Sequence, residues 1–299
     1  MTDNLADGNA RKGRLRSRSV VLKLGFLVAL IIMIIVGVLI GMRFVAHERA
    51  QNRQIVTMNG DIQLFQEELL SISADIQLLQ EKLLIGLNVG AIDYSEGEYN
   101  YLAIGNGITK HSLSDFWWNE IGMAATSEEF DYYHIVVDYL KRTHGEVNNH
   151  ALNFSLWERL SSDRSEALVL IDACLSDELD LVTIQLGENV SDISTFGDDC
   201  EELINYIKAK APAAEIVVVG DFWSNGVRDS YKAMAARNCD VFFASLSKIR
   251  DIEQYQCGLG TIVNDNEGQP HTVEHAGAAA HPGNNGMREI ADSIIDVLR

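Results

Sequence analysis

From residue 100 onward, short apolar segments alternate with segments of helical periodicity, and this alternation constrains the fold more than any other feature of the sequence. Leu179–Leu186 and Glu215–Gly220 are strongly apolar, as in strands that are buried on both faces. Asp198–Ala211, which lies between them, has the spacing of an amphipathic helix. Strands joined by helices in this way form a parallel sheet with helices on both sides. Right-handed crossovers then predict an α/β fold with three layers and a flavodoxin-like sheet.

The first predicted strand ends in a glycine turn. The strand Asn100–Ile104 runs into Gly105-Asn106-Gly107, where the backbone can approach a ligand closely. Open parallel sheets bind ligands beyond the carboxyl ends of their strands, so this turn is a favoured place for a binding or catalytic group. A plain exit from strand to loop is the alternative. We expect the other elements at Asp131–Arg142, Val147–Phe154, Ser165–Cys174, Ser230–Asn238, Val241–Ala244 and Met287–Leu298.

Several short blocks resemble, in order, those of the SGNH/GDSL hydrolases. They are Gly105–Thr109 (Gly-Asn-Gly-Ile-Thr), Trp117-Trp118, Gly122–Ala125 (Gly-Met-Ala-Ala), Gln185–Asn189 (Gln-Leu-Gly-Glu-Asn) and His281-Pro282-Gly283 leading into Gly286-Met287. The first block is similar to the Gly-Asn-Ser-Ile-Thr sequence of one subgroup of the family. The resemblance implies that residues 98–299 form one SGNH hydrolase-like domain.

The same resemblance implies a set of catalytic positions. A serine esterase needs a nucleophile, a base that takes its proton, and donors aimed at the developing oxyanion. His281 matches the family's base, Asn189 its side-chain oxyanion donor and Gly122 its backbone oxyanion donor. The nucleophile position falls on Gly107. We expect these four groups to converge on one hollow at the rim of the sheet.

Two positions depart from the family's pattern. Gly107 has no side chain, so covalent catalysis is lost and we expect this chain to be inactive. Ala278 stands where the family commonly places an aspartate, three residues before the histidine. A backbone carbonyl can orient an imidazole in place of that acid. The glycine has two explanations that the sequence leaves open, a deliberate knockout of the serine or a natural pseudoenzyme.

The composition excludes several other functions. The net charge is −19, although residues 1–23 carry six basic and only two acidic side chains. The remainder is therefore strongly acidic and would repel nucleic acid. The sequence has no P-loop and no clustered metal-binding pattern, so we expect no cofactor and no metal. Disulfides and buried free thiols both stay open for Cys174, Cys200, Cys239 and Cys257.

The N-terminal region predicts a membrane anchor. Leu24–Met42 is an uncharged apolar run of 19 residues, nearly long enough to cross the hydrocarbon core of a bilayer. A cleaved signal peptide is the alternative, but its apolar core is usually shorter, roughly 7–15 residues. We therefore expect a transmembrane helix at 24–43. The excess of basic residues before it places the tail 1–23 in the cytoplasm and the C-terminal domain outside the cell membrane.

A heptad pattern follows the predicted anchor. Apolar residues alternate spacings of three and four, which is typical of a coiled coil, at Ile55, Met58, Ile62, Phe65, Leu69, Ile72, Ile76, Leu79 and Leu83. We expect a helical stalk at 48–86 that forms a homo-oligomer or binds a membrane protein through 55–83. An amphipathic helix packed on its own domain is the alternative.

Three functions are consistent with these features. The first is a membrane-anchored, extracytoplasmic esterase that removes acyl groups, such as acetyl, from cell-surface carbohydrate. The second is an acyltransferase that works with a membrane partner. The third is a non-catalytic pseudoenzyme that binds a ligand or serves as a scaffold.

Overall fold

The computed structural model describes residues 33, 36–45, 47, 92, 94, 98–160, 164–223 and 226–299. It has two compact units, Met1–Asp75 and Ile76–Arg299. In the first unit, residues 36–45 are helical. Among the residues described, no helix is both long and apolar enough to cross a bilayer. The predicted anchor at 24–43 lies only partly within the described residues, and the tail 1–23 and the stalk 48–86 lie outside them.

The second unit is built on a five-stranded parallel sheet, which confirms the predicted α/β fold. Its strands are β1 (Tyr99–Gly105), β2 (Val147–Asn153), β3 (Leu181–Gln185), β4 (Glu215–Val219) and β5 (Phe242–Ala244). They pair in the order β2-β1-β3-β4-β5 and are all parallel, which is the flavodoxin-like strand order. The carboxyl ends of β1, β3 and β4 therefore lie side by side at one edge.

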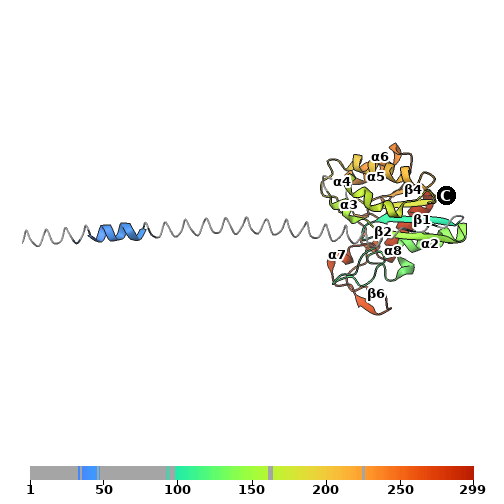
Figure 1. Ribbon diagram of the computed structural model, residues 1–299. Coiled ribbons are helices and arrows are strands. Elements are labelled where there is room, and N and C mark those ends of the chain that lie inside the picture. Colours follow the sequence, from blue (N-terminus) through green and yellow to red (C-terminus); the bar gives the residue numbers. More distant parts are fainter. Residues whose placement is uncertain are drawn as a thin grey trace, which may run out of the picture. The chain divides into compact units, whose positions relative to one another are not determined.

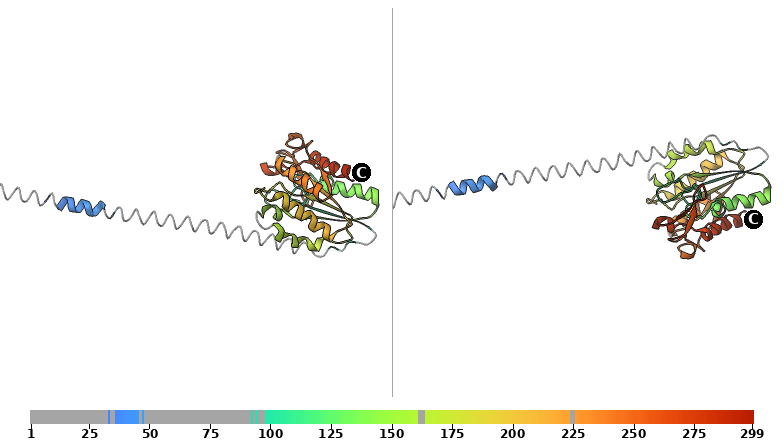
Figure 2. Two further views of the ribbon diagram at one scale, coloured as in Figure 1. Left: turned by 90° about the horizontal axis from the view of Figure 1, so that it is seen from above. Right: turned by 90° about the horizontal axis from the view of Figure 1, so that it is seen from below.

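Helices cover both faces of this sheet (Figures 1 and 2). Alternate residues of β1 enter different cores: Leu102 and Ile104 face one, and Tyr101 and Ala103 face the other. The first core is closed by α3 (Ser155–Arg159), α4 (Arg164–Ala167), α5 (Phe196–Lys210) and α6 (Gly226–Asn238). The second is closed by α2 (Tyr132–His144) and α8 (Asn284–Val297).

The remaining elements are short. They are the antiparallel hairpin of β6 (Ile262–Asn264) and β7 (Pro270–Thr272), helix α7 (Ala276–Ala279), and the 3₁₀ helices η1 (Glu128–Phe130), η2 (Leu168–Cys174) and η3 (Glu253–Tyr255). The helix expected at Ser165–Cys174 is thus a short α4 followed by the 3₁₀ helix η2. All four cysteines are free thiols, and burial raises the pKa of both Cys174 and Cys200 to about 12.

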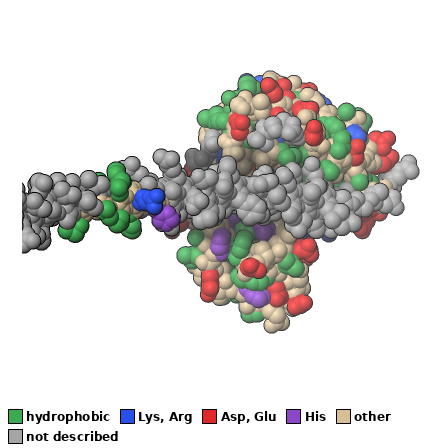
Figure 3. Space-filling model, turned by 60° about the vertical axis from the view of Figure 1, so that its left-hand side comes forward, with side chains coloured by type: hydrophobic (Ala, Val, Ile, Leu, Met, Phe, Trp, Pro, Cys, Tyr) green, Lys and Arg blue, Asp and Glu red, His purple; other side chains and the backbone are tan. Residues whose placement is uncertain are grey.

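Acidic side chains are scattered over the visible surface of the second unit, and basic ones are sparse there (Figure 3). This distribution agrees with the net charge of −19. Such a surface repels polyanions.

Candidate active site

The side chain of Asn106 fixes the conformation of the turn that follows β1. Its side-chain oxygen accepts a hydrogen bond from the Ile108 N–H at 2.9 Å, which fixes the turn locally. Its Nδ2 donates to Glu158 Oε1 and to Glu188 Oε2, each at 3.0 Å. Gly105 must be glycine, because a Cβ there would collide with the Thr109 side chain. The turn is therefore rigid on the side that faces the end of β3.

Gly107 leaves its own N–H available on this turn. Within the described residues that N–H makes no hydrogen bond, while the Gly107 carbonyl accepts from the Met123 N–H at 2.8 Å. A Cβ at position 107 would come within 2.8 Å of Cδ2 of His111. The His111 ring thus fills the space that a serine side chain would need, and it must move if a side chain is introduced there.

His281 has the geometry of a neutral base. Its Nδ1 lies 2.7 Å from the Gly277 carbonyl oxygen. A carbonyl can only accept, so Nδ1 carries the proton and Nε2 is left as the acceptor. Burial lowers the pKa of His281 to about 4; the Gly277 carbonyl opposes this shift, and the nearby charges of His111 and His275 add to it. The ring also packs edge-on against Trp223, with centroids 4.7 Å apart.

A backbone carbonyl orients the His281 imidazole. It belongs to Gly277, and the neighbouring Ala278, which departs from the aspartate of the resemblance described above, is fully buried. His111 connects this base to the turn, because its ring covers Gly107 and its charge acts on His281.

The two other predicted donors are already engaged. Asn189 Nδ2 donates to Glu158 Oε2 at 2.6 Å, which leaves one of its two N–H groups for a ligand. The Gly122 N–H donates to Asp131 Oδ2 at 3.3 Å, a long hydrogen bond. Gly122 adjoins Met123, whose N–H binds the Gly107 carbonyl, so it also lies beside the turn. Hydrogen bonds thus connect the turn at Gly107 to Asn189, through Asn106 and Glu158, and to the Gly122–Met123 segment. His281 is related to this turn through the electrostatic effect of His111, and of the three N–H donors only that of Gly107 is fully available among the described residues.

Glu158 is a site residue that the motifs do not identify. It is 1% exposed and accepts hydrogen bonds from three neighbours at the sheet edge. These are Asn106 Nδ2, Asn189 Nδ2 and the Gly187 N–H, the last at 2.5 Å. One carboxylate on α3 therefore ties the turn after β1 to the loop after β3.

Glu188 is a second acid in the same network. Its Oε1 accepts from Gln185 Nε2 at 2.8 Å and from the Phe222 N–H at 3.2 Å. Burial raises the pKa of Glu188 to about 7; Lys232 opposes the shift, and the charges of Asp221 and Glu158 add to it. This carboxyl group therefore keeps its proton to a higher pH than an exposed glutamate does. Across the described part of the chain, no group of three or more ligating side chains is placed to hold a metal ion.

Solved structures that resemble this chain include several ester hydrolases. A two-domain esterase active on acetylated mannans is 17% identical, with a TM-score of 0.45, and the match covers 67% of this chain and 48% of that one. A family 3 carbohydrate esterase from Clostridium thermocellum is 12% identical, with coverages of 67% and 94% and a TM-score of 0.46. Phospholipase A1 from Streptomyces albidoflavus is 12% identical, with coverages of 67% and 100% and a TM-score of 0.41.

This chain matches only about half the length of the mannan esterase. No protein-family model matches the chain, and no curated protein sequence matches it. TM-scores below 0.5 at such low identity do not define a shared fold. The function proposed below therefore depends on the chain's own residues.

Proposed function

We propose that this chain is an SGNH-type ester hydrolase by descent, in which Gly107 stands in place of the nucleophilic serine and abolishes esterase activity. The intact site would hydrolyse small acyl esters, such as acetyl groups on cell-surface carbohydrate. The half-buried Trp223 ring beside His281 offers an apolar wall for an acyl group or a sugar ring.

The observation that carries this proposal is the state of His281. A surface histidine is usually hydrated, whereas this ring is oriented by a carbonyl through Nδ1, kept neutral and influenced by the charge of His111, the histidine that covers Gly107. A neutral imidazole with a free Nε2 is what a hydroxyl nucleophile needs as its base. The Asn106–Glu158–Asn189 connection supports the same assignment, because it links an amide donor to that turn.

With a serine at position 107, these groups would carry out acyl transfer to water. The hydroxyl oxygen would attack the ester carbonyl while its proton passes to His281 Nε2. The developing oxyanion would accept from the Gly107 N–H and from the second N–H of Asn189. The alcohol would leave with the proton from His281, and water activated by the same imidazole would then release the acid.

Gly107→Ser tests this proposal. We expect the substituted chain to hydrolyse p-nitrophenyl acetate at least ~10³-fold faster than the matched control Gly107→Ala, which carries the same Cβ without a hydroxyl. Because that Cβ crowds His111, Gly107→Ser/His111→Ala serves as a second variant that provides the space. If both serine variants fold and neither exceeds Gly107→Ala, the assignment of the catalytic positions is wrong.

A non-catalytic binding protein is the second candidate. Two observations favour it: the His111 ring fills the nucleophile's space, and the Gly122 N–H is bound to Asp131. In this case neither serine variant gains activity, although a carbohydrate ligand binds the unaltered chain.

An acyltransferase that works with a membrane partner stays a prediction; transfer of the acyl group to sugar rather than to water would identify it.

We also propose that residues 24–43 anchor the chain in the cell membrane, with the second unit outside the cytoplasm. The described part of this segment supports the anchor, because residues 36–43 are helical and their apolar side chains are exposed. Met33 is 66% exposed, and Ile40 is 64% exposed. In water such an exposed apolar surface is unfavourable, whereas in a bilayer it is solvated by lipid.

A further inference from the structure

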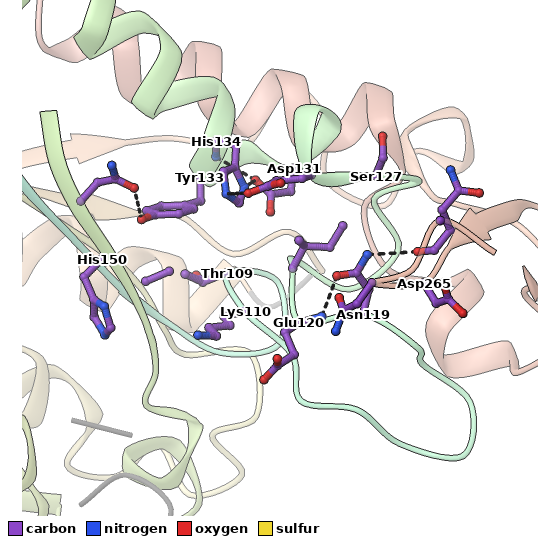
Figure 4. A pocket seen from close by; sticks show the side chains of 17 residues that line it. Thr109, Lys110, Asn119, Glu120, Ser127, Asp131, Tyr133, His134, His150 and Asp265 are labelled. Atoms are coloured by element: carbon purple, nitrogen blue, oxygen red, sulfur yellow. Dashed lines mark hydrogen bonds and ion pairs between the residues drawn. The ribbon is translucent and has the colours of Figure 1, made fainter. Parts of the chain in front are cut away.

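A concave site lies beside the candidate active site. It is a cavity of about 580 Å³, which is within the range of small-molecule sites. Its walls come from the turn after β1, the start of α2, the middle of β2 and the β6–β7 hairpin (Figure 4). Gly107, Asn189 and His281 do not line it. The two sites nevertheless share Asp131, whose Oδ1 holds His134 in the cavity wall while its Oδ2 accepts from the Gly122 N–H.

The wall of this cavity is held in place by hydrogen bonds between its own residues. The Tyr133 hydroxyl donates to Asn149 Oδ1 at 2.6 Å and thereby joins α2 to β2. Asn119 Nδ2 donates to the Asn264 carbonyl at 3.0 Å and joins the loop after β1 to the hairpin. These contacts fix the cavity before any ligand enters, which lowers the entropic cost of binding.

Other polar side chains in the cavity have no partner of this kind. Within the described residues, the side chains of Lys110, Glu120, His150 and Asn266 make no hydrogen bond, and all four line the cavity. Figure 4 shows Lys110 and Glu120 near each other, with His150 farther to the left. Lysine only donates, a carboxylate only accepts, and an amide does both. Burial and the Lys110 charge lower the pKa of His150, so its neutral ring also does both near pH 7.

The charge and polarity of the lining restrict the ligand class. Four carboxylates line the cavity, from Glu120, Glu128, Asp131 and Asp265, against one lysine and His134, whose pKa is raised because its acidic neighbours outweigh the lowering effect of burial. An anionic ligand such as a phosphate or a uronic acid would be repelled. An acyl chain would find few apolar contacts, because the lining is mostly polar. A ligand with many hydroxyl groups can hydrogen-bond to both the donors and the acceptors of this lining, since each hydroxyl both donates and accepts.

We propose that this cavity binds a neutral saccharide and holds the sugar chain beside the ester-cleaving turn. The position of the ester relative to the cavity rests on the proposed function. Binding of the sugar does not require catalysis, so the two can be tested separately.

Saccharide binding to the full-length chain tests this inference. The chain is kept in a detergent without a sugar headgroup and titrated calorimetrically with neutral pentasaccharides of glucose, mannose and xylose. We expect at least one to bind with a Kd in the micromolar to millimolar range, and at least tenfold more tightly than the anionic trigalacturonate. Absence of neutral-sugar binding at millimolar concentration would overturn the proposal, and so would a preference for trigalacturonate.

Matched variants locate the binding. Glu120→Ala and Asn266→Ala each remove a polar group from the cavity, and we expect each to raise the Kd about fivefold or more. Glu166→Ala and Asn238→Ala change exposed residues away from it and should leave the Kd unchanged. Equal effects of the two pairs would place the sugar elsewhere.

Hydrolysis of p-nitrophenyl acetate by Gly107→Ser without saccharide binding would contradict this inference alone. Saccharide binding without hydrolysis by Gly107→Ser would contradict the proposed catalytic site alone.

Discussion

Three histidines, His111, His275 and His281, lie close enough to influence one another electrostatically. Since burial and the positive charges of its neighbours both disfavour protonation, His281 stays neutral across the physiological range. A base that is neutral under working conditions is ready to accept a proton, which is the property that the site would need if a nucleophile were present.

The titration of His281 can be measured directly. We expect its ring carbon and nitrogen signals in NMR to stay constant from pH 8 to pH 5 and to change with a midpoint of about 4, the lowered pKa. His281→Gln assigns the signals, and the backbone spectrum reports whether the chain is still folded. A midpoint at or above pH 6 would show that the ring is solvated and is not held as described.

Glu188 makes the stability of the folded chain depend on pH. Its pKa is about 7 in the folded chain against an ordinary value of 4.5, so between these pH values the folded state holds a proton that the unfolded state has released. The free energy of unfolding therefore falls as pH rises from about 4.5 to 7, and the stabilising contribution is complete only below that window.

This contribution is testable by urea unfolding at pH 5 and pH 8. We expect the unaltered chain to lose about 2 kcal/mol more over this range than Glu188→Gln, which cannot titrate. Glu166→Gln, at an exposed position, controls for the general effect of losing an acid. Identical pH dependence of the unaltered chain and Glu188→Gln would show that Glu188 titrates normally in the folded state.

Some of the site residues could be predicted from the sequence and others could not. His281 and Asn189 lie in short sequence motifs, so both could be selected as site residues from the sequence. Their catalytic roles stay a prediction. No sequence motif identifies Glu158 as a site residue, because the three groups that donate hydrogen bonds to it lie on segments brought together only by the fold. The covering of Gly107 by His111 depends on the path of a loop, which local sequence does not determine.

At the scale of elements, α6 is fixed to the sheet edge by a buried ion cluster. Asp221, which follows β4, is fully buried and lies 2.6 Å from Lys232 Nζ and 2.8 Å from Arg228 Nε. Lys232 Nζ also donates to the Leu186 carbonyl at 2.7 Å, so one ammonium joins α6 to the ends of both β3 and β4. These contacts set the position of the loop that carries Glu188 and Asn189.

Lys232→Met tests the cluster. The substitution keeps the length of the side chain but leaves Asp221 with less compensation, and we expect the free energy of unfolding to fall by about 3–5 kcal/mol. Lys248→Met, at an exposed lysine, should change it by less than about 0.5 kcal/mol. A loss below 1 kcal/mol for Lys232→Met in urea denaturation would show that the ammonium is not needed to compensate the buried carboxylate.

Predictability also differs between elements. The central strands and long helices follow hydrophobic periodicity, and each was expected within a few residues of where it lies. The β6–β7 hairpin was not expected, because its strands have three residues each and mostly face solvent. The 3₁₀ helix at Leu168–Cys174 was expected as α-helix, since the apolar spacing of so short a segment does not separate the two.

At the scale of the whole molecule, the proposed anchor determines where the chain resides. We expect the chain to remain in the membrane pellet after alkaline carbonate extraction, because the apolar residues of 24–43 are solvated by lipid. Val38→Lys/Leu39→Lys places two charges in that segment and should release the chain, since each lysine disfavours insertion by about 3 kcal/mol. Release of the unaltered chain by carbonate would contradict the anchor.

The proposed catalytic site requires residues 107 and 281 to form a nucleophile–base pair once the hydroxyl is restored. A fluorophosphonate reagent reports on this pair, because it forms an O–P bond with an activated hydroxyl and releases fluoride, while the base takes the hydroxyl's proton. In Gly107→Ser we predict one adduct, located at residue 107 by peptide mass spectrometry and lost in Gly107→Ser/His281→Ala. A folded Gly107→Ser without an adduct at 107, or labelling that persists without the imidazole, would contradict the account.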